Sequence, residues 1–138
     1  MPLEHFFFNF SLLSSSLLII NSTFAAIKRS VMSKEETIQL RKLRETSRKV
    51  VPEGGQVWLY GSRARGDARQ DSDWDLLILL KKPSITSQDE DEIAYPFVVE
   101  GWKNGMAVSP QMYTFNEWTE RSFTPYYKNV EQDKIRIR

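Results

Sequence analysis

The chain has 138 residues, of which 41% are hydrophobic and 12% aromatic, and this length suits one small α/β domain. Its formal net charge is +1, from 19 Lys and Arg against 18 Asp and Glu, so no overall basic field favours strong binding of nucleic acid or of an anionic membrane. The absence of cysteine excludes disulfides, thiol nucleophiles and zinc–thiolate sites, and the single histidine, His5, lies in an atypical N-terminal segment. The remaining carboxylates, hydroxyls, lysines and arginines suit a hard, oxygen-bound cation such as Mg²⁺ together with phosphates.

Residues 1–31 differ from the rest because their apolar residues form blocks without an amphipathic period. A secretory signal would place positive charge before the apolar core, whereas here Glu4 precedes it and two basic residues follow it. A membrane span would need about 20 mostly apolar residues, and polar residues interrupt this run. We favour a third interpretation, that Met32 is the true start, over a signal or anchor and over a folded extension, because a helix capping sequence follows Met32 directly. We therefore expect a cytoplasmic protein without a membrane segment, and a neutral functional domain over residues 32–138.

The first elements after Met32 lead toward a glycine turn. Ser33 to Glu36 form a capping box, and apolar residues at helical spacing behind it predict an amphipathic helix of about 17 residues. Pro52 and two glycines end that helix, and residues 57–60 predict a short buried strand. Residues 74–80 are apolar on both faces beyond Asp75, which predicts an internal strand that is covered on both sides.

The second half of the chain predicts further helices and strands. Residues 87–90 cap a helix that runs to about Lys103 and kinks or restarts at Pro96, and a turn follows at residues 104–105. Residues 106–113 predict a strand, and Thr114 and Glu117 cap a short helix after it. A last helix begins at Thr124–Pro125, and residues 135–138 alternate like a strand.

Two carboxylates open the strand over residues 74–80. Asp73 and Asp75 stand two residues apart, so in a strand their side chains project to the same side. Adjacent carboxylates repel each other unless a cation joins them. A pair about 5 to 7 Å apart can share one Mg²⁺ and leave positions for triphosphate oxygens and water. The spacing therefore predicts a metal site, although an acidic turn of this kind is also common on solvated surfaces.

A glycine turn precedes this acidic pair in the sequence. Gly61 and Ser62 follow one strand and begin a helix, where free backbone N–H groups and the helix dipole favour an anion. The Ser62 hydroxyl can donate to phosphate, and Arg63 and Arg65 supply positive charge nearby. A Gly-Ser turn alone is most often an ordinary turn. Its place after one buried strand, about ten residues before an acidic pair at the head of the next, predicts a nucleotide site.

These motifs resemble those of the DNA polymerase beta-like nucleotidyltransferase superfamily, in particular its minimal nucleotidyltransferases. The matching residues are Gly61-Ser62, Arg65-Gly66 and Ser72-Asp73-Trp74-Asp75 before an apolar strand, and the resemblance extends over residues 33–138. It implies a compact α/β fold of the α+β kind, with a mixed sheet of about three to five strands flanked by helices. It also implies Mg²⁺-dependent transfer of a nucleoside monophosphate from ATP or another NTP to a hydroxyl acceptor. Asp73 and Asp75 would be catalytic metal ligands, and Ser62 would contact phosphate.

The sequence departs from the family pattern on the third predicted strand. Active members usually place a third carboxylate there, but residues 106–111 contain no acid, and the expected matching residue is Ser109. A serine hydroxyl is neutral at working pH and a poor base. Losing a general base typically lowers the rate by about 10² to 10⁴, while metal and nucleotide binding can persist. Glu100 or Glu117 can substitute only if the fold brings one of them close to the pair.

A second function class is a catalytically weak protein-binding or antitoxin-like module. Minimal nucleotidyltransferases are often paired with a small helical protein of the higher-eukaryote-and-prokaryote nucleotide-binding (HEPN) type, which the resemblance implies as a partner. Exposed aromatic residues would be the anchors for such a protein, and the alternative is that they pack against the sheet. The candidates are Trp102, Trp118, Phe123, Tyr126 and Tyr127.

Overall fold

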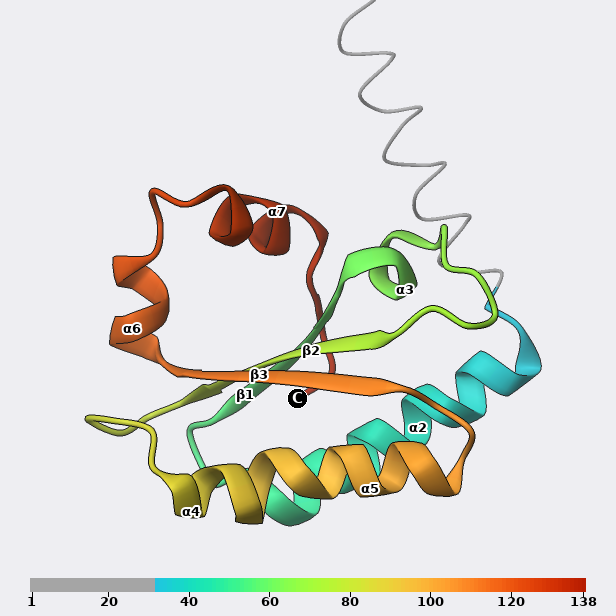
Figure 1. The fold of residues 1–138 in the computed structure, drawn as a ribbon, viewed down its shortest axis with the longest axis horizontal. Coiled ribbons are helices and arrows are strands. Elements are labelled where there is room, and N and C mark those ends of the chain that lie inside the picture. Colours follow the sequence, from blue (N-terminus) through green and yellow to red (C-terminus); the bar gives the residue numbers. More distant parts are fainter. Residues whose placement is uncertain (1–31) are drawn as a thin grey trace, which may run out of the picture. The chain divides into compact units, whose positions relative to one another are not determined.

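A mixed four-stranded sheet organises residues 32–138, the part of the chain that the computed structural model describes (Figure 1). The expected N-terminal extension over residues 1–31 lies outside the described residues. The strand order is β3-β2-β1-β4, with β1 antiparallel to both β2 and β4 and with β2 parallel to β3. The strands are β1 (Gln56–Tyr60), β2 (Trp74–Leu80), β3 (Val108–Thr114) and β4 (Ile135–Arg136). The predicted α/β fold with a mixed sheet is confirmed.

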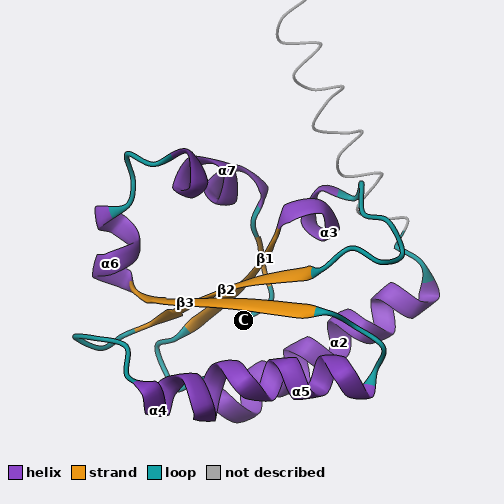
Figure 2. Cartoon of the chain, viewed as in Figure 1, coloured by secondary structure: helices purple, strands orange, loops and turns teal. Residues whose placement is uncertain are grey.

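Strand β2 is internal and covered on both faces, as its sequence predicts. Leu76 and Ile78 belong to a core shared with helices α2 (Lys34–Val50) and α5 (Tyr95–Lys103). Leu77 and Leu79 instead join a second core with helices α6 (Phe115–Glu120) and α7 (Pro125–Asp133). Figure 2 shows these two helical layers on opposite sides of the sheet. Because alternate residues of a strand face opposite sides, Asp75 lies on the side of α6 and α7.

The local signals for α2, α6 and α7 are confirmed by their caps. Helix α2 has 17 residues, and the Ser33 hydroxyl and the Glu36 carboxylate form the predicted reciprocal capping box. Thr114 and Glu117 cap α6 in the same way, and the Thr124 hydroxyl accepts from the N–H of Tyr127 at the start of α7. None of the helices in residues 32–138 is long and apolar enough to cross a membrane.

The helix predicted from residue 87 differs from the observed one in its cap and its irregularity. Thr86, one residue earlier, is the N-cap, because its hydroxyl accepts from the N–H of Asp89. After α4 (Ser87–Asp89), the chain forms a π turn over Glu90–Ala94 and then restarts as α5 at Tyr95, with Pro96 in the first turn, which agrees with the predicted restart. Proline has no N–H and clashes with the preceding helical turn, and the wide turn directly before it accommodates the ring.

Strand β3 begins two residues later than the sequence predicts, at Val108. The N–H of Met106 donates to the carbonyl of Gly101, which closes the end of α5 and keeps Met106 out of the strand. Proline has no N–H to donate to a neighbouring strand, so within sheets it is tolerated in edge strands. Pro110 fits this rule because β3 is at the edge of the sheet. The edge position explains how an unusual strand residue is tolerated next to the candidate site.

The predicted aromatic anchors divide into buried and exposed groups. Trp118 is buried against Tyr113 and Tyr127, so for Trp118 and Tyr127 the packing alternative holds. Phe123 and Trp102 are 79% and 66% exposed, respectively. Tyr126 is 37% exposed and packs its ring against Trp118 edge to face. Of the predicted anchors, Phe123, Trp102 and Tyr126 are therefore exposed to a partner protein, and the other two are not.

Candidate active site

The antiparallel pairing of β1 and β2 brings the glycine turn and the acidic pair together. Tyr60, the last residue of β1, pairs with Asp75 near the start of β2. Helix α3 (Gly61–Arg65) begins directly after Tyr60, so Gly61 lies beside the carboxylate of Asp75 and Ser62 follows in the first turn of α3. Gly61 and Asp75 are well separated in the sequence, and the antiparallel register of β1 and β2 brings them together in space.

Gly61 is required at this position for two physical reasons. Its φ angle is +71°, in the left-handed region that side chains with a Cβ rarely adopt. A Cβ added to Gly61 would also lie 2.5 Å from an Oδ atom of Asp75. The glycine therefore allows the backbone to approach the carboxylate more closely than any other residue would.

A Gly61→Ala substitution should both destabilise the domain and displace the Asp75 carboxylate. The left-handed conformation alone costs about 1 to 2 kcal/mol for a residue with a Cβ. Gly105→Ala is the matched control, because Gly105 has a φ of +64° but open space around the added Cβ. Denaturant unfolding should show a larger loss for Gly61→Ala, and only that variant should weaken nucleotide binding. Equal effects of both variants would show that the contact with Asp75 is unimportant.

The two carboxylates influence each other electrostatically. Asp73 is exposed and Asp75 is half-buried. Burial raises the pKa of Asp75, the charge of Asp73 raises it further, and the nearby charge of Arg65 opposes both effects. A bound cation would relieve this repulsion, which fits the predicted metal site. In residues 32–138 no group of three or more His, Cys, Asp or Glu side chains is arranged to hold a metal.

Ser109 occupies the position expected for a third carboxylate. The parallel register between β2 and β3 pairs Ser109 with Asp75, and paired residues in neighbouring strands project to the same side of the sheet. The alternative acids are engaged elsewhere. Glu117 caps α6 through the N–H of Thr114, and the carboxylate of Glu100 accepts from the side-chain amide of Asn104.

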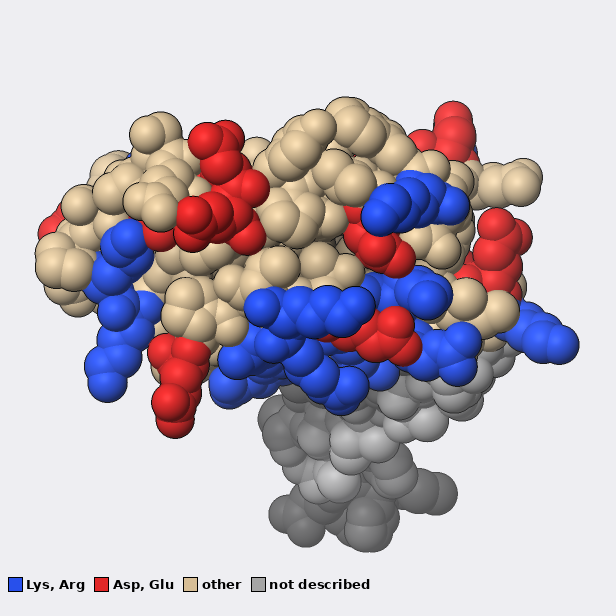
Figure 3. Space-filling model, turned by 90° about the horizontal axis from the view of Figure 1, so that it is seen from below, with Lys and Arg blue, Asp and Glu red and all other residues tan. Residues whose placement is uncertain are grey.

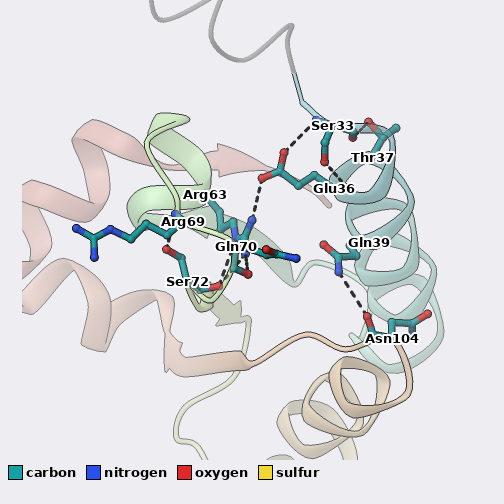
Figure 4. A network of polar contacts seen from close by, with 9 residues as sticks. All are labelled: Ser33, Glu36, Thr37, Gln39, Arg63, Arg69, Gln70, Ser72 and Asn104. Carbon is teal, nitrogen blue, oxygen red and sulfur yellow. Dashed lines mark hydrogen bonds and ion pairs between the residues drawn. The ribbon is translucent and has the colours of Figure 1, made fainter.

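Arg63, which the sequence predicts as a nucleotide contact, points toward protein groups in the structure (Figure 4). Its side chain is only 7% exposed and forms an ion pair with Glu36 at 2.8 Å. The guanidinium also donates to the carbonyls of Gln70 and Ser72, both at 3.0 Å, and lies over the ring of Trp74. These contacts bind the loop before β2 to helix α2 and hold Asp73 at the head of the strand. The Arg63 guanidinium is therefore occupied by Glu36 and by two loop carbonyls in this structure.

Comparison with known proteins identifies the fold around this site. Residues 40–137 match a family model described as "Nucleotidyltransferase domain". The chain belongs to this nucleotidyltransferase family. The predicted superfamily is thereby confirmed. The present chain is similar in fold to a chain of a solved structure described as "Crystal structure of the toxin-antitoxin with AMP-PNP". The TM-score is 0.52 and the sequence identity is 17%, over 72% of each chain. Among curated proteins, none is similar enough in sequence to match.

Arg65 remains accessible at the candidate site. Its side chain is 46% exposed and forms ion pairs with Asp133 at 2.8 Å and with Asp67 at 3.3 Å. The hydrogen bond from Arg65 to Asp133 raises the pKa of Arg65, which keeps the guanidinium charged. Arg65 therefore stays a candidate phosphate contact, with Asp67 and Asp133 as competing acceptors.

Two tyrosines that the sequence does not assign to this site lie close to Asp75. The hydroxyls of Tyr60 and Tyr126 are 3.0 Å apart, and their rings pack edge to face. Burial raises the pKa of both phenols, and the charge of Asp75 adds to that shift, so both hydroxyls are protonated at neutral pH. Tyr60 directly precedes Gly61, a position that gives a sequence signal. Tyr126 gives none, because only the packing of α7 brings it there.

A polar pocket of the nucleotidyltransferase domain is separate from this site. It has a volume of about 410 Å³ and lies between the start of α2, the loop over residues 68–72 and residues 105–107. Of the predicted site residues, only Arg63 lines it, and Trp74 forms part of its wall. Because Trp74 and Asp75 face opposite sides of β2, this pocket opens on the other side of the sheet from the carboxylates.

Proposed function

We propose that this protein is a Mg²⁺-dependent nucleotidyltransferase that transfers a nucleoside monophosphate from ATP or another NTP to a hydroxyl acceptor. The close approach of the Gly61 backbone to the Asp75 carboxylate carries the proposal, because it assembles the two halves of the family motif at one point. AMP-PNP, an analogue of ATP, accompanies the structurally similar toxin–antitoxin pair, which supports a nucleoside triphosphate as the donor. A triphosphate substrate fits a cytoplasmic location.

The donor set of the site fits magnesium. Asp73 and Asp75 would hold the ion, since carboxylate oxygens are the hard ligands that Mg²⁺ prefers. The raised pKa of Asp75, caused by burial and by the charge of Asp73, indicates a place where a cation is favoured. When bound, Mg²⁺ would neutralise charge that develops on the phosphate oxygens.

The residues around the carboxylates would bind and orient the triphosphate. The Ser62 hydroxyl can donate a hydrogen bond to a phosphate oxygen, and Arg65 supplies positive charge beside it. Gly61 allows the substrate to approach the backbone. At Ser109 a neutral hydroxyl stands where a carboxylate would accept the proton of the acceptor hydroxyl, so we expect slow turnover in spite of intact binding.

Calorimetric titration of ATP with Mg²⁺ into the full-length chain tests the proposal. Nucleotide should range up to about the millimolar level that is typical of weak enzyme sites. The Asp73→Asn, Asp75→Asn double variant should lose Mg²⁺-dependent binding, whereas Asp71→Asn should keep it, because Asp71 lies outside the pair. If the double variant binds ATP with Mg²⁺ as tightly as the wild type, Asp73 and Asp75 are not the ligands of the metal.

The stability of the double variant separates loss of binding from loss of fold. Asp75 is half-buried next to Asp73, and its raised pKa means that its charged form is disfavoured in the fold. Without metal, the double variant should therefore melt at or above the temperature of the wild type at neutral pH. A lower melting temperature would attribute the loss of binding to damage of the fold.

A catalytically weak protein that acts through a protein partner is a second candidate, favoured by the serine at position 109. Similarity to one member of a toxin–antitoxin pair supports a protein partner, and a small helical protein of the HEPN type is the expected kind. Phe123, 79% exposed, is an available anchor. Coexpression with the neighbouring gene product should yield a complex that Phe123→Ala weakens. Recovery of the protein alone would count against this candidate.

A further inference from the structure

Positive charge is concentrated on one side of a domain whose total charge is neutral. Helix α2 carries Arg41, Lys42, Arg48 and Lys49, and Lys103 ends the adjacent helix α5. Figure 3 views the molecule from this side and shows Lys and Arg side chains gathered in a band, with little acidic surface inside it. The net charge of the sequence therefore conceals a local basic surface.

Three of these basic groups have no acidic partner in residues 32–138. Arg41 and Lys42 share a single acid, Glu45, with N–O distances of 4.0 and 3.6 Å across exposed side chains. Arg48, Lys49 and Lys103 are exposed and form no ion pair among the described residues. The surface thus keeps a surplus of positive charge that an anionic ligand would satisfy.

Two exposed aromatic side chains lie within the same surface. Tyr95 and Trp102 of α5 are 53% and 66% exposed, and their rings pack edge to face with centroids 6.1 Å apart. Neither belongs to the buried cores of the sheet. Flat aromatic faces held in water offer stacking surface to a planar ligand.

A groove between α2 and α5 brings one of the aromatic rings next to two of the basic groups. It has a volume of about 300 Å³, and Lys49, Tyr95 and Lys103 all line it. Glu100 lines it too, but the Glu100 carboxylate accepts a hydrogen bond from the Asn104 amide at 2.9 Å. We call the surface formed by Arg48, Lys49, Tyr95, Trp102 and Lys103 the α2–α5 face.

We propose that the α2–α5 face binds single-stranded nucleic acid. Cations beside exposed aromatic rings match the phosphates and the unstacked bases of a single strand. A protein partner is less well matched, because protein interfaces are depleted of lysine, whereas Lys49 and Lys103 border the groove. The face lies on the side of the sheet covered by α2 and α5, opposite Asp73 and Asp75, so the proposal does not depend on nucleotidyl transfer.

Fluorescence anisotropy with the full-length chain and labelled 15-nucleotide single strands, oligothymidylate and oligouridylate, tests the proposal. The affinity should fall with salt, with a log–log slope of about 2 to 3 if three or four phosphates are neutralised. Trp102→Ala should weaken binding about tenfold through loss of stacking, and the Lys49→Glu, Lys103→Glu pair should weaken it at least as much. The Asp73→Asn, Asp75→Asn variant should bind the strand like the wild type.

Matched controls lie elsewhere on the surface. Phe123→Ala removes a still more exposed aromatic ring, and Lys81→Glu, Lys128→Glu reverses two exposed charges away from the face. Neither control should change the affinity, and thermal melting should show that every variant is folded. The proposal would be overturned if the protein binds no single strand, or if the control variants lose as much affinity as the variants of the α2–α5 face. It would also be overturned if Trp102→Ala does not change the affinity and a poly-glutamate peptide binds equally well. This last result would assign the face to an acidic protein.

Discussion

Ser109→Asp should raise the rate of nucleotidyl transfer by about 10² to 10⁴, the range associated with a general base. The substitution places a carboxylate on β3 directly across from Asp75, on the same side of the sheet. The natural serine hydroxyl is neutral at working pH and accepts a proton poorly. Single-turnover transfer from ATP to a hydroxyl acceptor would measure the gain separately from product release.

Gln111→Asp is the control for added charge on the same strand. Gln111 pairs with Leu77, two residues further along β2, so its carboxylate would stand away from the acidic pair. It should leave the transfer rate unchanged. Ser109→Asp should also make stability depend more strongly on Mg²⁺, because three neighbouring carboxylates repel one another until a cation joins them. A Mg²⁺-dependent gain in melting temperature without any gain in rate would assign Ser109 to the metal site only.

The candidate site was predictable from the sequence where its signals are local. The Gly61 turn follows an apolar strand, and Asp73 and Asp75 begin another, so strand periodicity and turn chemistry suffice to place both. The third position was predictable as Ser109 only through the family resemblance, and the parallel register of β2 and β3 is consistent with it. The capping boxes at Ser33 and Thr114 were equally local and are confirmed.

The remaining features depend on contacts between distant segments. The place of Arg63 directly after Gly61 and Ser62 suggests a phosphate contact, and only the position of α2 shows that Arg63 pairs with Glu36. Tyr126 reaches the site through the packing of α7, with no local signal. Composition reports a neutral domain, whereas the fold gathers the charges of α2 on one side (Figure 3). Sums over a sequence carry no information about where a surface places its charges.

Arg63→Ala should lower the free energy of unfolding by about 2 to 4 kcal/mol, because it breaks a largely buried ion pair and leaves two loop carbonyls without their donor. Arg63→Lys should recover only part of that loss. The planar guanidinium donates to Glu36, Gln70 and Ser72 at once, whereas the compact ammonium of lysine lacks this fork of donors. Arg65→Ala is the matched control: its exposed ion pairs should contribute at most about 1 kcal/mol.

The pH dependence of unfolding identifies the Arg63–Glu36 contact as the cause. Burial by itself would raise the pKa of Glu36, but hydrogen bonds from the Ser33 N–H and the Arg63 guanidinium outweigh it, and the pKa lies below 4.5. The stabilisation from Glu36 is therefore complete above pH 4.5 and is lost as the pH falls through the lower, folded-state value. In Arg63→Ala this acid-range loss should shrink, and Mg²⁺-dependent nucleotide binding should weaken, because the loop no longer holds Asp73 in place. Unchanged nucleotide binding in a destabilised Arg63→Ala variant would restrict Arg63 to folding.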